Sequence, residues 1–174
     1  MRSKALLGAL LVLCLALASL ASAETIQKGS LRISFDGQIT PNKLPRKGTA
    51  PVAVAVDTKI SATEGELAQL KQIEIAINRF GILDSTGLPK CAIPDIQPAT
   101  TEKALEACRG SLVGQCHFSA TVSLSRQASF PSEAKLYAYN GTYKGKPAIL
   151  AHAYGEQPVP TSFTLPFIIT KSKG

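Results

Sequence analysis

The chain lacks tryptophan and has two histidines, and aromatic residues make up only 6% of its 174 residues. Domains that bind nucleic acids carry a dense basic stripe with aromatic side chains interleaved. Here the basic residues are scattered along the chain, as Lys28, Arg32, Lys43, Arg46, Lys47, Lys59, Lys71 and Arg79. We therefore expect no nucleic-acid partner, and we interpret the positive charge as favouring solubility and weak attraction to anionic envelope polymers.

Catalytic and metal-binding motifs are also absent from the sequence. No serine lies in a G-x-S-x-G motif, no C-x-x-C pair marks a zinc site, and the aspartates lack the spacing of a calcium loop. His117 adjoins Cys116 without the spacing of helical metal ligands. The sequence therefore predicts no catalytic residue, no metal and no cofactor.

The N-terminus has the three zones of an export signal. Arg2 and Lys4 precede the apolar run 5–20, and the small residues at 21–23 suit a peptidase. The run is shorter than the roughly 20 residues of a membrane-spanning helix, and an uncleaved anchor is the alternative. We expect residues 1–23 to be a cleaved signal peptide and residues 24–174 to be a single secreted, extracellular domain without a transmembrane segment. Its 17 basic and 12 acidic residues give a net charge of +5.

Alternation of apolar and polar residues is the dominant pattern of the mature chain, and it is typical of half-buried strands. It predicts strands at 31–35, 52–56, 73–77, 118–124 and 163–169, with less regular strands at 134–139 and 147–154. The strand at 147–154 is apolar on both sides, which indicates cover on both faces. Pro166 cannot donate to a ladder, so its strand is predicted at an edge or with a bulge. The pattern indicates a mainly β fold, an antiparallel β-sandwich of immunoglobulin-like or jelly-roll-like type.

One short α-helix is predicted near residues 101–109. Thr101 can cap it, Ala104, Leu105, Ala107 and Cys108 supply an apolar face, and Gly110 can end it. A second helix start at 61–66 is the alternative to a polar linker there.

Glycine-containing pairs predict the turns. Asp36-Gly37 is expected to make a tight reversal, and Asn140-Gly141 with the 145–147 segment is expected to connect a hairpin. Asn140 also begins a glycosylation motif, but the turn interpretation is favoured and no glycan is inferred.

Three cysteines follow the export signal, and an oxidising compartment permits a disulfide. We favour Cys91–Cys108, because it would tie the helix to the loop that leads into it. Closing a loop of about 18 residues stabilises a fold by roughly 3 kcal/mol. The competing pairing is Cys108–Cys116, since these two are near in sequence. In the favoured pairing Cys116 would be a free thiol at the start of a strand.

Four tyrosines, Tyr137, Tyr139, Tyr143 and Tyr154, cluster around the predicted hairpin. The ordinary interpretation is cross-strand packing. The functional interpretation is a candidate ligand face, because aromatic rings on a sheet stack on sugars or line an apolar groove. His152 alternates with alanines in a strand that looks buried, so we interpret it as a hydrogen-bonded core or rim histidine, and it is also the candidate polar site of an enzyme.

Three segments, FDGQITPNKLPRKGTAPVAV, IQPATTEKALEAC and YNGTYKGKPAILAHAYG, resemble a group of uncharacterised secreted proteins from actinobacteria. The likeness covers most of the mature chain. It implies a bacterial source and export to the cell envelope or medium, and it carries no active site.

These observations favour a non-enzymatic extracellular module that binds a cell-envelope polymer or another protein, or that serves a structural role in the envelope. The alternative is an extracellular hydrolase of unrecognised type acting through His152. A third hypothesis is a stress-induced envelope protein without a small ligand.

Overall fold

The computed structural model describes residues 24–65, 72–77, 81–122, 128–156 and 159–171. The predicted signal peptide, residues 1–23, lies outside the described residues. The chain divides into two compact units, residues 1–75 and residues 76–174. Each unit is built around its own antiparallel sheet, and each is described by itself.

The first unit contains a three-stranded sheet in the order β1-β2-β3, formed by β1 (Glu24–Lys28), β2 (Leu31–Thr40) and β3 (Ala53–Ala62). Cross-strand partners project from the same face of a sheet. The register therefore gathers the large apolar side chains on one face: Ile26, Leu31, Ile33, Phe35, Ile39, Val54, Val56 and Ile60. The opposite face carries mainly polar side chains, so this sheet is strongly amphipathic.

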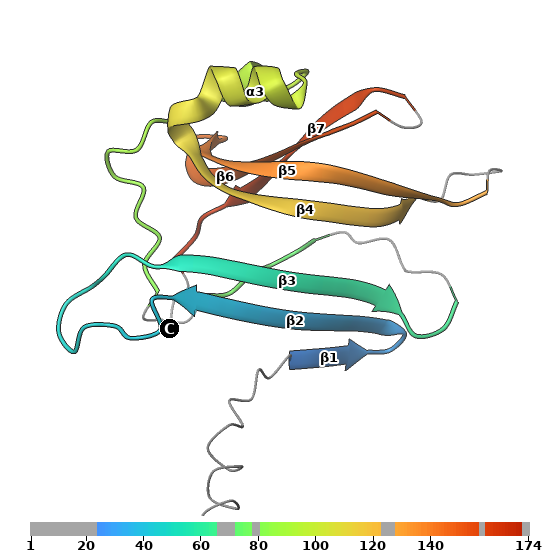
Figure 1. Ribbon diagram of the computed structural model, residues 1–174, viewed down its shortest axis with the longest axis horizontal. Coiled ribbons are helices and arrows are strands. Elements are labelled where there is room, and N and C mark those ends of the chain that lie inside the picture. Colours follow the sequence, from blue (N-terminus) through green and yellow to red (C-terminus); the bar gives the residue numbers. More distant parts are fainter. Residues whose placement is uncertain (1–23, 66–71, 78–80, 123–127, 157–158, 172–174) are drawn as a thin grey trace, which may run out of the picture. The chain divides into compact units, whose positions relative to one another are not determined.

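The second unit contains a four-stranded antiparallel meander in the order β4-β5-β6-β7. Its strands are β4 (Leu112–Val122), β5 (Phe130–Tyr143), β6 (Lys146–Gly155) and β7 (Thr161–Ile168). Two helices precede the sheet, α2 (Ile93–Ile96) and α3 (Thr101–Cys108), and a 3-10 turn at Arg109–Ser111 leads into β4. Figure 1 shows α3 lying along one face of this sheet.

A compact core fills the space between α3 and the sheet. Its buried members are Cys91, Ile96, Ala104, Cys108, Tyr139, Ala148 and Leu150. The helix contributes Ala104 and Cys108, whereas the sheet contributes side chains of β5 and β6. A helix of eight residues is not stable alone, so this burial is what holds α3 in place.

Within the described residues, the two antiparallel sheets and the short helices α2 and α3 confirm the mainly β class, and α3 confirms the helix predicted near residues 101–109. The face-to-face packing of a sandwich stays a prediction. β7, which contains Pro166, is an edge strand as predicted, and the interior strand β6 is buried at successive positions from Leu150 to Ala153. Among the described residues, no helix has both the length and the apolar character needed to cross a membrane.

Several local predictions are wrong. The segment at 72–77 is exposed and is not a strand, whereas β1 was not predicted. Asp36-Gly37 does not turn, because its pairing with Val56 and Asp57 continues the β2–β3 ladder. Thr100, not Thr101, caps α3, and its side chain accepts a hydrogen bond from the Lys103 amide at 3.5 Å.

The hairpin between β5 and β6 also differs from the prediction. Asn140-Gly141 lies inside β5, and the turn consists of Lys144 and Gly145, with φ of 49° and 75°. Two consecutive residues with positive φ match the twist of an antiparallel pair. The register therefore extends to Tyr143 opposite Lys146.

Candidate functional site

A row of polar side chains crosses all four strands of the second sheet. Gln115 of β4 is opposite Tyr137 of β5, Tyr137 is opposite His152 of β6, and His152 is opposite Thr164 of β7. Partners in such a row project from one face. Alternation places the other three tyrosines on this face as well, and we call Gln115, Tyr137, Tyr139, Tyr143, His152, Tyr154 and Thr164 the tyrosine–histidine face.

This is the face that α3 covers, since Tyr139 is a member of the core beneath the helix. Tyr139 and His152 are fully buried. Tyr137, Tyr143 and Tyr154 are half-buried, and Gln115 is exposed. Tyr137 and Tyr143 also pack against this core. The face thus has a closed end beneath the helix and an open end around Tyr154, with the half-buried Tyr137 between the two.

His152 is held by the chain segment that leads into α3. Its Nε2 lies 3.2 Å from the carbonyl oxygen of Ala99. A carbonyl oxygen only accepts hydrogen bonds, so Nε2 carries the proton and Nδ1 is the bare nitrogen of a neutral ring. Burial lowers the pKa of His152, and the bond to Ala99 only partly opposes this effect. The ring is therefore neutral at pH 7.

Three buried polar atoms of this face have no hydrogen-bond partner in the described part of the chain: the Tyr139 hydroxyl, His152 Nδ1 and the Thr164 hydroxyl. Burial raises the pKa of Tyr139, and the nearby Tyr137 hydroxyl adds to the rise. Within the described residues, His152 Nδ1 therefore forms no hydrogen bond to a carboxylate or a nucleophile, and the one hydrogen bond of the ring that the structure shows is to the Ala99 carbonyl.

A strap formed by residues 88–100 fixes the closed end of the face. The Cys91 amide donates to the Asn140 carbonyl at 2.8 Å, and the Asn140 side chain donates to the Pro89 carbonyl at 2.9 Å. Cys91 forms a parallel bridge with Gly141. Asn140 is almost fully buried and its side-chain amide is engaged by the strap, so it is a structural side chain of the folded unit.

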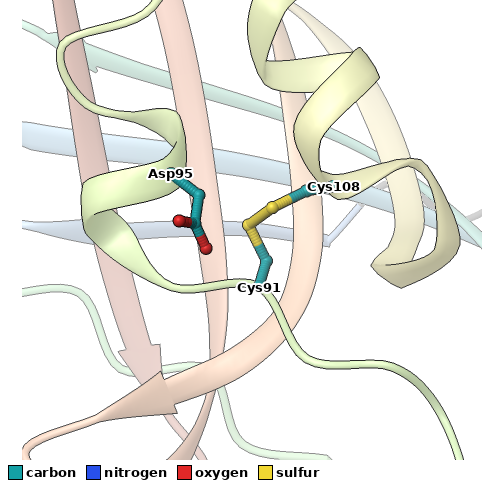
Figure 2. Close-up of side chains that lie close together, drawn as sticks. All are labelled: Cys91, Asp95 and Cys108. Atoms are coloured by element: carbon teal, nitrogen blue, oxygen red, sulfur yellow. A yellow bond between two sulfur atoms is a disulfide. The ribbon is translucent and has the colours of Figure 1, made fainter.

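The disulfide Cys91–Cys108 closes the strap onto the end of α3, with a Cα–Cα distance of 5.5 Å. This pairing confirms the favoured prediction, and Cys116 is a free, exposed thiol. Figure 2 shows the Asp95 carboxylate beside the two sulfur atoms. Both sulfurs are consumed by the disulfide bond, and the carboxylate accepts from the Ala92 amide at 3.2 Å. In the oxidised protein, the Cys91–Cys108 disulfide and the hydrogen bond between Asp95 and Ala92 therefore stabilise the strap.

The open end of the face carries charges of both signs. His117 and Lys135 are cross-strand partners further along β4 and β5. His117 Nε2 lies 3.7 Å from a Glu133 carboxylate oxygen, and both side chains are exposed. Exposed pairs of this kind contribute little to stability. Basic and acidic side chains are therefore both present next to the open end of the face.

Sequence reasoning identified the tyrosines, His152 and the disulfide but missed the strap and Asn140. Only the register reveals that Tyr137, His152 and Thr164 form one row. Comparison of the chain with protein-family models, with curated proteins and with solved structures finds no match.

Proposed function

We propose that this protein is a secreted, non-enzymatic module that binds a polysaccharide of the bacterial cell envelope at the open end of the tyrosine–histidine face. The observation that carries the proposal is the position of Tyr137 and Tyr154. They are half-buried, lie on adjacent strands and project from one face, with Tyr137 opposite the buried His152 and Tyr154 two residues further along β6.

Two partly exposed aromatic rings on a rigid sheet suit a sugar chain. The apolar face of a pyranose ring stacks on an aromatic ring, while polar groups at the edge orient its hydroxyls. Gln115 lies opposite Tyr137, and Ser162 lies opposite Tyr154. These two side chains supply donors and acceptors next to the two rings.

Export is supported by the signal-like leader, by the disulfide, which is typical of oxidising compartments, and by the resemblance to secreted actinobacterial proteins. A hydrolase acting through His152 has less support. Its ring is fully buried, Nε2 is engaged by the Ala99 carbonyl, and Nδ1 has no hydrogen-bond partner within the described residues.

The test is co-sedimentation of the secreted protein with isolated peptidoglycan sacculi. We expect Tyr137→Ala and Tyr154→Ala each to weaken binding about fivefold, because each substitution removes one stacking ring. Tyr137→Phe keeps the ring and should bind nearly as well as the parent. Tyr143→Ala is the matched control, because Tyr143 lies at the hairpin, where Lys144 Nζ sits 5.3 Å from its ring centroid.

Failure of the parent protein to sediment with sacculi would contradict the proposal. Equal sedimentation of the parent and a folded Tyr137→Ala, Tyr154→Ala double variant would also contradict it, since binding would then lie elsewhere. Far-ultraviolet circular dichroism of each variant establishes that it is folded.

A further inference from the structure

The loop that joins β2 to β3 is the most basic exposed segment among the described residues. It carries Lys43, Arg46 and Lys47, and no acidic residue occurs between Asp36 and Asp57. Residues 41–49 are exposed throughout. The only large apolar side chain among the three cations is Leu44, which is 57% exposed.

Apolar side chains continue from the loop onto the sheet. Ile39 and Val54 are cross-strand partners on the apolar face, next to the loop. Their exposed fractions are 50% and 63%, and that of Val52 is 41%. We call Ile39, Lys43, Leu44, Arg46, Lys47, Val52 and Val54 the β2–β3 tip.

The acidic residues nearest to the loop along the chain project from the other face of the sheet. Asp36 and Asp57 are partners in the β2–β3 register, and their positions alternate with those of Ile39 and Val54. Within the described residues, neither aspartate forms an ion pair with Lys43, Arg46 or Lys47. The tip combines exposed apolar side chains with an uncompensated cluster of positive charge.

We infer that the β2–β3 tip docks onto the surface of an anionic lipid membrane. Such a surface offers phosphates to the cations and an apolar layer just below them, and shallow insertion satisfies both kinds of side chain. A second copy of the chain would bring two cationic loops together, which their charge opposes. The inference is independent of the proposed glycan binding, because it concerns a different unit of the chain.

The experiment is flotation of the protein, purified from the medium of a secreting host, with two kinds of vesicle. One kind contains phosphatidylglycerol and phosphatidylcholine, and the other contains phosphatidylcholine alone. We expect binding to the anionic vesicles only, and we expect it to weaken at high salt. The triple variant Lys43→Gln, Arg46→Gln, Lys47→Gln should bind roughly a hundredfold more weakly.

Two single variants separate charge from insertion. Leu44→Ser should weaken binding severalfold while leaving its salt dependence unchanged. Lys59→Gln is the matched control, because Lys59 lies on the polar face of the same sheet. This variant should bind the anionic vesicles nearly as well as the parent protein. Equal binding to both kinds of vesicle, binding that survives the triple substitution, or no binding at all would overturn the inference. A concentration-dependent dimer abolished by Leu44→Ser would likewise overturn it.

Discussion

Among the described glycines of the second unit that can be compared, Gly141 is the one at which an added β-carbon would meet the closest neighbouring atoms. A β-carbon there would lie 2.6 Å from the Cys91 carbonyl oxygen and 2.7 Å from Leu150 Cδ1. Both contacts are closer than van der Waals distance, and the first is with backbone. The absence of a side chain at this position lets the strap approach β5 and bridge to it.

We expect Gly141→Ala to lower the free energy of unfolding by about 1–3 kcal/mol, because the added methyl group overpacks the closed end of the face. Urea denaturation followed by circular dichroism measures the change. Gly155→Ala is the control, since a β-carbon there meets no atom within 4 Å. Equal destabilisation by the two substitutions would show that the close approach at Gly141 is not the cause.

His152 makes stability depend on pH. Burial lowers its pKa below the ordinary 6.5, so the folded protein binds this proton less readily than the unfolded chain. The contribution of the neutral His152 to the free energy of unfolding should therefore be at its maximum above about pH 6.5. It should decrease as the pH falls from about 6.5 through the lowered pKa.

The measurement is urea denaturation between pH 7.5 and pH 5. His152→Gln should remove this part of the pH dependence, because a glutamine amide can reach Ala99 without titrating. His117→Gln should leave it in place, since His117 is exposed on β4. A pH dependence that is unchanged in His152→Gln would contradict this assignment.

At the scale of the element, the strap and α3 act as one brace across β5 and β6. The disulfide joins their ends, with 17 residues of sequence separation. The strap also forms hydrogen bonds, with the side chain of Asn140 at one end and with the ring of His152 at the other. Loss of the disulfide should therefore weaken the packing of the strap and α3 against the closed end of the tyrosine–histidine face.

We expect the double variant Cys91→Ala, Cys108→Ala to lose roughly 3 kcal/mol of unfolding free energy, the value of closing a loop of this length. Chemical denaturation of the purified variant measures it. Cys116→Ala is the control and should be close to neutral, because Cys116 is free and exposed. A double variant as stable as the parent would contradict the role of the brace.

The elements that could be predicted from sequence are those with strict alternation and a ladder partner. β2, β3 and β4 follow from their alternating apolar residues, and α3 follows from its spacing. The segment at 72–77 alternates equally well but has no strand partner among the described residues, so alternation alone is insufficient. Asp36-Gly37 and Asn140-Gly141 resemble turns, yet long-range pairing with neighbouring strands overrides that local preference.

At the scale of the whole molecule, the candidate site depends on register, which a sequence does not reveal. Tyr137 and His152 are separated by 14 intervening residues and are direct partners only because the turn is at Lys144 and Gly145. A turn at Asn140-Gly141 would have paired different residues and scattered the tyrosines over other rows. The residue types of the site were therefore predictable, whereas their assembly into one row was not.

Tyrosine fluorescence offers a direct test of the proposed binding face. The chain has four tyrosines and no tryptophan, and all four tyrosines project from the tyrosine–histidine face. Intrinsic emission therefore reports on this face alone.

The decisive measurement is a titration of the secreted protein with soluble glycan strands released from sacculi, followed by tyrosine emission. The proposal predicts a saturable change that is lost in the Tyr137→Ala, Tyr154→Ala double variant. Binding detected by sedimentation with no change in tyrosine emission would contradict it, because the glycan would then occupy another surface.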